Sequence, residues 1–395
     1  MPDILVERVG TLGRIRLNRP KALNALTHGM VGAIDAALDL FAADEGVAAI
    51  LLTGEGERGL CAGGDLRSLY ESAGSSSAEN FWRDEYRLDA RIAHYEKPFV
   101  AILDGITMGG GVGLSGHAGH RVVTGRSRIA MPETGIGYLP DVGGTWLLPR
   151  APGETGTYLG LTGEPMGAAD AIFAGFADAC VPAATLPALI DALAALAPEA
   201  GHATVRAAID ARAVTPGPAP LAAAQAVIDR CFAHDRVEDI LAALAAEGSE
   251  FAGRTRATLL EKSPSSLVLT LRLLRLGRAA TTLEACLERE FHASLALLAE
   301  GDFREGIRAA VIDKDKAPRW SPPTLDAVDP ERIAGWLAPR AAPVFSVPDD
   351  VLSPLLPHPE APAPAGLEGG LQGSQRDLDV SFEASASLRH LRMRG

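Results

Sequence analysis

The first 180 residues alternate short apolar runs with segments whose apolar side chains recur at helical spacing. The predicted strands are residues 4–9, 13–18, 47–53, 99–103, 121–123 and 127–130, and the predicted helices are 29–43 and 78–95. Strands that alternate with helices favour an α/β fold in which helical crossovers join parallel strands. The first two strands are close enough in sequence to pair around a turn at Gly10 and Thr11.

From about residue 185 the chain is rich in alanine and leucine, with glycine and proline mainly between the periodic segments. The predicted helices there are 186–196, 222–232, 239–247, 267–276, 283–298 and 302–311. After residue 341 the composition changes to Pro, Ala, Gly and Ser, which favours disorder. We therefore predict an α/β core with the active site at 1–184, a helical region at 185–340 and a disordered tail at 341–395. The basic end of this tail, 389–394, is either a docking peptide or untethered.

The formal net charge of −13 argues against nonspecific nucleic-acid binding, which relies on clustered Lys and Arg. The four cysteines show no paired spacing, so neither a disulfide framework nor a zinc site is predicted. The first residues lack the basic and apolar segments of a signal peptide, and no apolar run reaches the ~18 residues of a membrane span. The sequence therefore predicts a cytoplasmic protein with no nucleic-acid or membrane partner.

Two glycine-rich turns each follow an apolar strand, at residues 61–67 (CAGGDLR) and 105–113 (GITMGGGVG). Glycines after a strand let the backbone approach a ligand closely and leave N–H groups free at the start of a helix. Two such donors that converge on one oxygen would form an oxyanion hole. The alternative is that the glycines serve only tight packing.

Two other uses of these segments are disfavoured. The match GVGLSG at 111–116 precedes Glu133, but no strand clearly ends at that glutamate, so dinucleotide binding is the weaker interpretation. His94, His117 and His120 could form a triad with Ser115, but the chain has no GxSxG element.

A third segment, residues 131–144 (MPETGIGYLPDVGG), holds two carboxylates among proline, glycine and large apolar residues. Burial in an apolar wall raises the pKa of a carboxyl group and makes it usable as an acid or base near neutral pH. Glu133 and Asp141 are therefore candidate catalytic groups. The alternative is that they only cap turns or helices.

Taken in order, RPKALNAL (19–26), AGGDLR (62–67), GITMGGGVGLS (105–115) and MPETGIGYLPDVGGTWLLPR (131–150) resemble the crotonase (enoyl-CoA hydratase/isomerase) superfamily. The resemblance implies a spiral of ββα units with a C-terminal helical region. It also implies that the backbone N–H groups of Gly64 and Gly110 hold the carbonyl oxygen of an acyl-CoA thioester.

Hydratases of the superfamily use two glutamates, and here the first position is Gly113 while the second is retained as Glu133. Asp141 and Glu85 instead make the chain similar to the branch that hydrolyses short 3-hydroxyacyl-CoA thioesters. Segments of the C-terminal half extend this similarity: residues 262–267, 287–291, 301–309 and 311–320. It covers roughly residues 3–340.

The resemblance implies hydrolysis of a short 3-hydroxyacyl-CoA, foremost 3-hydroxyisobutyryl-CoA to 3-hydroxyisobutyrate and CoA in valine degradation. Glu133 would be the nucleophile or the general base. Asp141 would hold water or the acyl hydroxyl, or assist proton transfer, and Glu85 would bind the acyl hydroxyl or orient its neighbours. The implied contacts to CoA are Lys21, Ala22, Leu23, Ala62, Gly63, Asp65 and Leu66, with Arg67 as a further phosphate partner. No metal and no cofactor beyond the CoA of the substrate is implied, and family members often form homo-oligomers.

Two alternatives remain open at this point. The chain could be a hydratase or isomerase acting on another acyl-CoA, since isomerases can work with a single glutamate. It could also be a binding protein that keeps the fold without catalysis, although Glu133 and both glycine turns are present.

Overall fold

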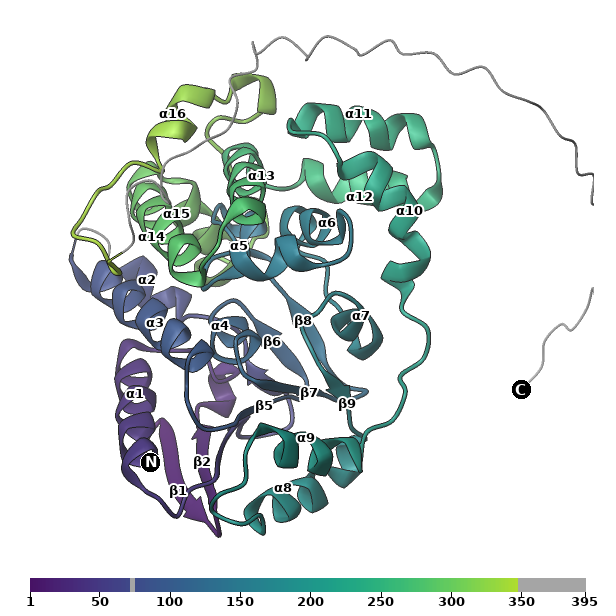
Figure 1. The fold of residues 1–395 in the computed structure, drawn as a ribbon. Helices are drawn as coiled ribbons and strands as arrows, with labels where there is room; N and C mark the ends of the chain where they lie inside the picture. The colour runs from purple at the N-terminus through teal and green to yellow at the C-terminus, as the bar shows by residue number, and fades with distance from the viewer. Residues whose placement is uncertain (72–74, 347–395) are drawn as a thin grey trace, which may run out of the picture. The chain divides into compact units, whose positions relative to one another are not determined.

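The computed structural model describes residues 1–71 and 75–346. A six-stranded sheet has the order β1-β2-β3-β5-β7-β9. Its strands are β1 (Ile4–Val9), β2 (Leu12–Leu17), β3 (Ala49–Gly54), β5 (Phe99–Leu103), β7 (His120–Val123) and β9 (Ala179–Cys180). Only β1 and β2 pair antiparallel, and the other neighbours are parallel. The predicted α/β class with parallel strands is confirmed (Figure 1).

A second sheet of three short parallel strands was not predicted. It consists of β4 (Gly59–Cys61), β6 (Ile106–Met108) and β8 (Arg128–Ala130), of which only the last was expected as a strand. Successive pairs β3–β4, β5–β6 and β7–β8 each place one strand in each sheet, which is the predicted spiral of ββ units followed by helices. Gly63 and Gly64 therefore follow β4, and Gly109, Gly110 and Gly111 follow β6, so part of the predicted turn at 105–113 is a strand.

Both faces of the large sheet are covered. In β3, Ile50 and Leu52 belong to the core under α1 (His28–Ala43) and α3 (Ser77–Ala93), and Leu51 faces α8 (Leu186–Ala194) and α9 (His202–Asp210). A strand buried on both faces is apolar throughout. This explains why the run 47–53 was recognisable in the sequence although it does not alternate.

The helix α1 illustrates how local sequence fixes an element. The side chain of Thr27 accepts a hydrogen bond from the Met30 N–H and caps the start of the helix. Met30, Ile34, Leu38 and Phe41 then form one buried stripe at helical spacing.

The remaining helices lie in both the predicted core, 1–184, and the predicted helical region, 185–340. They are α2 (Leu66–Glu71), α4 (Gly110–Gly116), α5 (Gly144–Leu147), α6 (Thr155–Thr162), α7 (Ala168–Phe173), α10 (Pro220–Phe232), α11 (Val237–Glu247), α12 (Glu250–Leu260), α13 (Pro264–Ala279), α14 (Leu283–Glu300), α15 (Asp302–Ile307) and α16 (Pro330–Gly335). The helix expected at 302–311 ends at Ile307 and continues as a π turn at Arg308–Ile312. The helices α5, α6, α7, α9, α12 and α16 were not predicted.

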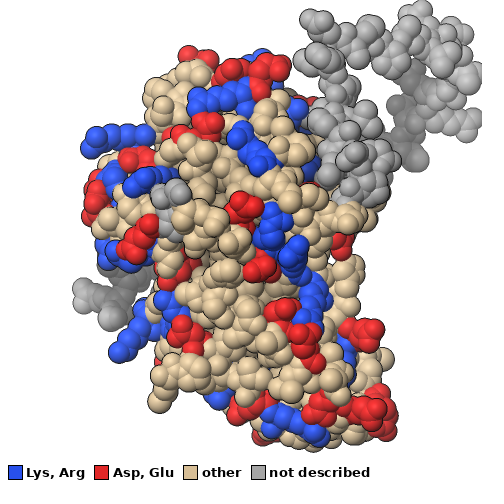
Figure 2. Space-filling view, turned by 90° about the vertical axis from the view of Figure 1, so that its left-hand side faces the viewer, with Lys and Arg blue, Asp and Glu red and all other residues tan. Residues whose placement is uncertain are grey.

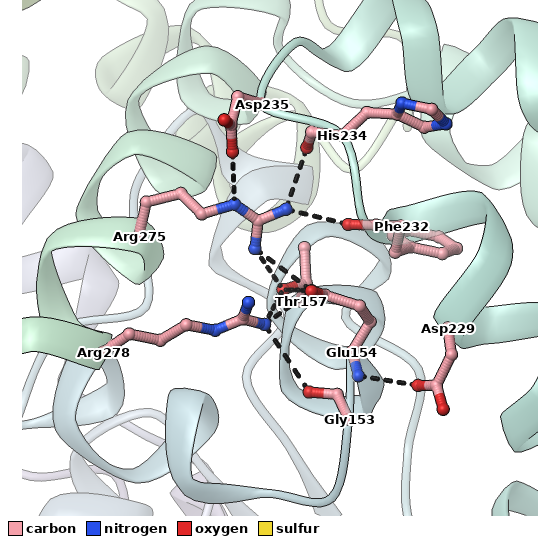
Figure 3. Close-up of polar contacts among 9 residues, drawn as sticks. All are labelled: Gly153, Glu154, Thr157, Asp229, Phe232, His234, Asp235, Arg275 and Arg278. Atoms are coloured by element: carbon pink, nitrogen blue, oxygen red, sulfur yellow. Dashed lines mark hydrogen bonds and ion pairs between the residues drawn. The ribbon is translucent and has the colours of Figure 1, made fainter. Parts of the chain in front are cut away.

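One ion-pair cluster ties α13 to the segments before it (Figure 3). The Glu154 carboxylate, just before α6, accepts hydrogen bonds from Arg275 at 3.0 Å and Arg278 at 2.6 Å. Arg275 also donates to the carbonyl oxygens of Phe232 and His234 at the end of α10. This partly buried network fixes the helical region against the segment that follows the candidate site.

Acidic and basic side chains are interspersed on the face in Figure 2, without a broad area of Lys and Arg. Within residues 1–71 and 75–346, no helix combines the length and apolar composition needed to cross a bilayer. The start of the predicted tail is described: the N–H groups of Val344 and Phe345 donate to the Glu288 carboxylate. The rest of the tail, including residues 389–394, lies outside the described residues.

Candidate active site

A cavity of about 340 Å³ lies where the two glycine turns meet the segment 131–141. All five residues proposed for the chemistry and three of those proposed for CoA line it: Gly64, Glu85, Gly110, Glu133, Asp141, Ala62, Gly63 and Leu66. Residues distant in sequence are therefore brought together as the motifs implied.

The two glycine turns approach each other backbone to backbone. A β-carbon added at Gly110 would lie 3.6 Å from the backbone nitrogen of Gly64 and 2.6 Å from Oε1 of Glu85. Gly64 lies after β4, and the N–H of the next residue, Asp65, donates to the Leu26 carbonyl oxygen. Gly110 is the first residue of α4. Among the described residues, neither the Gly64 nor the Gly110 N–H has a protein acceptor.

Other glycines of these turns do serve packing, as the alternative interpretation held. A β-carbon at Gly111 would lie 2.4 Å from the Cys61 carbonyl oxygen, whereas one at Gly64 would have no heavy atom nearer than 3.6 Å. Packing therefore explains Gly111. It does not explain the small residue at Gly64.

Glu133 begins a 3₁₀ helix (Glu133–Ile136) and its side chain is buried against the glycine turn. The residue is 6% exposed, and a β-carbon at Gly109 would lie 3.1 Å from its Oε1. Its Oε2 has no hydrogen-bond partner among the described residues. Burial, and next the nearby Asp141, raises the pKa of Glu133 well above its usual range. A carboxylate so placed takes up a proton readily, which suits a general base.

Asp141 is held by two tyrosines. The Tyr86 hydroxyl donates to its Oδ2 at 2.8 Å, and the Tyr138 hydroxyl lies 3.1 Å from the same oxygen. Burial raises the pKa of Asp141 to about 6, while the hydrogen bonds from the two tyrosines oppose that rise. The group therefore titrates in a pH range that an activity measurement can reach.

We expect the hydrolysis rate to fall on the acid side of pH 6, because Asp141 with a raised pKa is a carboxylate only above about this pH. In Tyr86→Phe the acid limb of kcat/KM should move to higher pH by about one unit, since a hydrogen bond that favours the charged form is lost. Tyr95→Phe is the matched control, because the Tyr95 hydroxyl donates to the Leu38 carbonyl oxygen instead. A pH–rate profile that is identical in both variants would contradict this role of Tyr86.

Glu85 projects from α3 into the cavity beside Gly110. Burial, and then the charge of Asp141, raises the pKa of Glu85 well above its usual range. Trp82, Glu85, Tyr86 and Asp89 recur at i, i+3, i+4 and i+7, so they form one buried stripe of the helix. Of these four residues, only Glu85 was predicted to belong to the site. The spacing alone indicates that the other three lie on the same face of the helix.

No carboxylate could occupy position 113 without rearrangement. A β-carbon there would lie 2.7 Å from Cβ of Val142 and 2.9 Å from both carboxylate oxygens of Asp89. The first glutamate of a two-glutamate hydratase is therefore absent from the sequence and has no space in the structure.

Three stacked aromatic side chains form the inner wall of the cavity. The Tyr138 ring lies 4.3 Å from the Phe303 ring and 5.8 Å from the Trp82 ring, centroid to centroid. Phe303 belongs to α15, which packs closely against the segment of Glu133. Glycine is required on both sides of this contact, at Gly306 in α15 and at Gly137 after Glu133, because a β-carbon at either position would meet backbone atoms of the other segment. Phe303 of the C-terminal region thus lines the cavity, although the active site was predicted within residues 1–184.

The remaining residues proposed for CoA lie beside this cavity and do not line it. The Ala62 N–H donates to the Leu23 carbonyl oxygen at 3.1 Å, which aligns the segment of Lys21, Ala22 and Leu23 with the first glycine turn. The Asp65 carboxylate is engaged with Arg19 at 2.9 Å and faces a neighbouring hollow.

The serine and histidines considered for a catalytic triad have other hydrogen-bond partners. The Ser115 hydroxyl donates to the Gly111 carbonyl oxygen, and His117 contacts the Val142 carbonyl oxygen at 2.8 Å. His94 and His120 contact Glu284 and His202. In the described parts of the chain, no cluster of three or more His, Cys, Asp or Glu is arranged to hold a metal ion.

Comparison with known proteins identifies the family of the chain. The family model for enoyl-CoA hydratase/isomerase matches residues 12–337. The mitochondrial 3-hydroxyisobutyryl-CoA hydrolase of Rattus norvegicus is 41% identical over 343 residues, covering 84% of this chain and 87% of that protein. The Homo sapiens protein of the same name is 39% identical over 343 residues, with the same coverage.

Two solved structures share the fold over most of the chain. A carnitinyl-CoA dehydratase from Mycobacterium thermoresistibile superposes with a TM-score of 0.83 and 44% identity, covering 87% of this chain and 99% of that chain. An enoyl-CoA hydratase from Rhodobacter sphaeroides 2.4.1 gives a TM-score of 0.77 and 45% identity, covering 86% and 98%.

The predicted cytoplasmic location is contradicted, because the hydrolases named above are mitochondrial proteins. That prediction rested on the net charge, the cysteine spacing and the composition of the first residues. These features do not distinguish the cytoplasm from the mitochondrion. The fold class and the family resemblance are confirmed: the match to the family model and the ~40% identity span the core, the site and the helical region. The chain belongs to the enoyl-CoA hydratase/isomerase family.

Proposed function

We propose that the protein hydrolyses a short 3-hydroxyacyl-CoA thioester, and specifically 3-hydroxyisobutyryl-CoA to 3-hydroxyisobutyrate and CoA, a step of valine degradation. The observation that carries the proposal is a pair of backbone N–H groups, without an acceptor among the described residues, beside one buried glutamate. The position of a second glutamate is Gly113, and its neighbours leave no space there for a side chain. The relatives at about 40% identity are named as hydrolases of this thioester.

The reaction needs stabilisation of a developing oxyanion and an activated attacking oxygen. The thioester carbonyl oxygen would accept hydrogen bonds from the N–H groups of Gly64 and Gly110, which stabilise the tetrahedral intermediate. Glu133 would either attack the carbonyl carbon to form an anhydride or take a proton from the attacking water. The C–S bond then breaks, and the CoA thiolate leaves and is protonated.

The other polar groups of the cavity would orient the acyl end. Asp141 would hold the water or the acyl hydroxyl, and Glu85, on α3, would bind the acyl hydroxyl or orient its neighbours. The CoA moiety would run from the cavity along Ala62 and Gly63 to the segment of Lys21–Leu23. A raised pKa favours the protonated form of Glu85, which can donate a hydrogen bond to a hydroxyl oxygen.

The buried inner wall predicts a preference for short acyl groups. Phe303→Ala should admit longer 3-hydroxyacyl-CoAs and raise their kcat/KM, relative to the four-carbon substrate, by about tenfold per additional accommodated methylene. Phe232→Ala is the control, since Phe232 is equally buried and lies outside the cavity. Both variants should lose stability by about 3–5 kcal/mol. If chain-length preference changed in neither variant, the acyl end would lie elsewhere.

The deciding assay is thiol release from a panel of 3-hydroxyacyl-CoAs beside hydration of the corresponding enoyl-CoAs. The hydrolase proposal requires release of free CoA from 3-hydroxyisobutyryl-CoA with no comparable hydration. The two solved relatives described as a dehydratase and a hydratase make hydration the second candidate. Rapid hydration without thiol release would establish that candidate instead.

A further inference from the structure

The backbone directly after Asp141 adopts a conformation that most side chains avoid. Val142 has a φ of 51°, in the left-handed region, and Gly143 follows with a φ of 79°. A β-branched residue in this region is a marked exception and persists only where surrounding contacts impose it. The position of Asp141 therefore depends on whatever holds the next residues.

The Glu290 side chain, from α14, supplies that hold. Its carboxylate accepts hydrogen bonds from the Gly143 N–H at 2.8 Å and the Thr145 N–H at 2.9 Å, and from the Thr145 hydroxyl. Glu290 is fully buried, so these bonds are shielded from water. Three donors on one carboxylate fix the loop at Gly143 and Thr145, the first and third residues after Val142.

The same helix also holds the side chain of Asp141. Ser294 is one turn beyond Glu290, and its hydroxyl oxygen lies 2.6 Å from the Tyr138 hydroxyl and 3.2 Å from that of Tyr86. These two tyrosines are the groups that bond the Asp141 carboxylate. One face of α14 therefore acts on the loop after Asp141 in two ways. Glu290 bonds the loop backbone directly, and Ser294 contacts the two tyrosines that bond the Asp141 carboxylate.

We propose that Glu290 is a positioning residue for the reaction, which acts by holding Asp141 at the cavity. This proposal rests on the proposed function. It adds that α14, in the C-terminal region, contributes to catalysis by positioning Asp141. Glu290 does not line the cavity itself, so its effect must pass through the loop.

The test compares two glutamates of the same helix. In Glu290→Gln the carboxamide offers an N–H group where the loop needs an acceptor, so one of the bonds to Gly143 or Thr145 is lost. Glu288→Gln is the matched control, because Glu288 is equally buried and accepts backbone N–H groups from Val344 and Phe345, away from the cavity. We expect kcat to fall about 10²-fold in Glu290→Gln with KM within about threefold of wild type, and kcat to stay near wild type in Glu288→Gln.

A double variant separates positioning from general damage. If Glu290 acts through Asp141, Glu290→Gln should lower kcat little further in an Asp141→Asn background. Equal kcat in the two single glutamine variants, or full additivity with Asp141→Asn, would overturn the proposal. If Glu290→Gln does not fold, Ser294→Ala decides: a kcat loss of about tenfold supports the role of α14, and an unchanged kcat contradicts it. Failure of the wild-type protein to release CoA would instead count against the proposed function.

Discussion

Glu133→Gln should lower kcat for thioester hydrolysis by about 10³–10⁴-fold, because a carboxamide can neither attack the carbonyl carbon nor accept a proton from water. KM should stay within about threefold, since the Gly64 and Gly110 donors and the cavity walls are unchanged. The fold should tolerate the change, because Oε2 of Glu133 has no hydrogen bond to lose among the described residues. Steady-state thiol release measures both constants.

The control for this variant is Glu199→Gln, which makes the same chemical change at an exposed position. It should have wild-type kinetics. If Glu133→Gln kept more than about a tenth of the wild-type kcat, Glu133 would be neither the nucleophile nor the base, and the assignment of the cavity would need another catalytic group.

Gly113→Glu should destabilise the protein by about 3 kcal/mol or more, and it should not confer hydration. The substitution restores the carboxylate that hydratases of the family use, but its β-carbon would meet Val142 and Asp89 within 3 Å. It would also bury a second acid beside Asp89, whose carboxylate oxygens have no described hydrogen-bond partner. Denaturant unfolding and an enoyl-CoA hydration assay give the two readouts.

Gly32→Glu is the matched control, since Gly32 lies in α1 with no heavy atom within 4 Å of an added β-carbon. There the change should be neutral or stabilising by up to ~1 kcal/mol, because glycine is a poor helix former. A Gly113→Glu protein with wild-type stability and new hydratase activity would show that the missing carboxylate alone separates the two reactions.

The long elements of the fold were predictable because their burial leaves a strong pattern. The strand β5 is apolar at every position, and α1 has one apolar stripe behind a Thr27 cap. The strands β4 and β6 were missed because each has only three residues and glycines lie in or next to it: Gly59 begins β4, and Gly105 and Gly109 flank β6. Glycines at such positions alone indicate a turn. Pairing across the second sheet, a tertiary effect, makes them strands.

The candidate site was predictable where a motif is contiguous. Gly64, Gly110, Glu133 and Asp141 could be placed from the family resemblance, and the structure brings them to one cavity. Phe303 and Glu290 act on the site from helices far along the chain, so no local pattern reports their contacts. Only the folded structure shows that the helical region closes the cavity and holds the loop after Asp141.

The most direct test is a crystal structure with a 3-hydroxyisobutyryl-CoA analogue in which a methylene group replaces the thioester sulfur. We expect the carbonyl oxygen to lie about 2.7–3.1 Å from the backbone nitrogens of both Gly64 and Gly110, with the Glu133 carboxylate facing the carbonyl carbon. A carbonyl oxygen bound away from these two N–H groups, or a Glu133 side chain turned to solvent, would contradict the proposed mechanism.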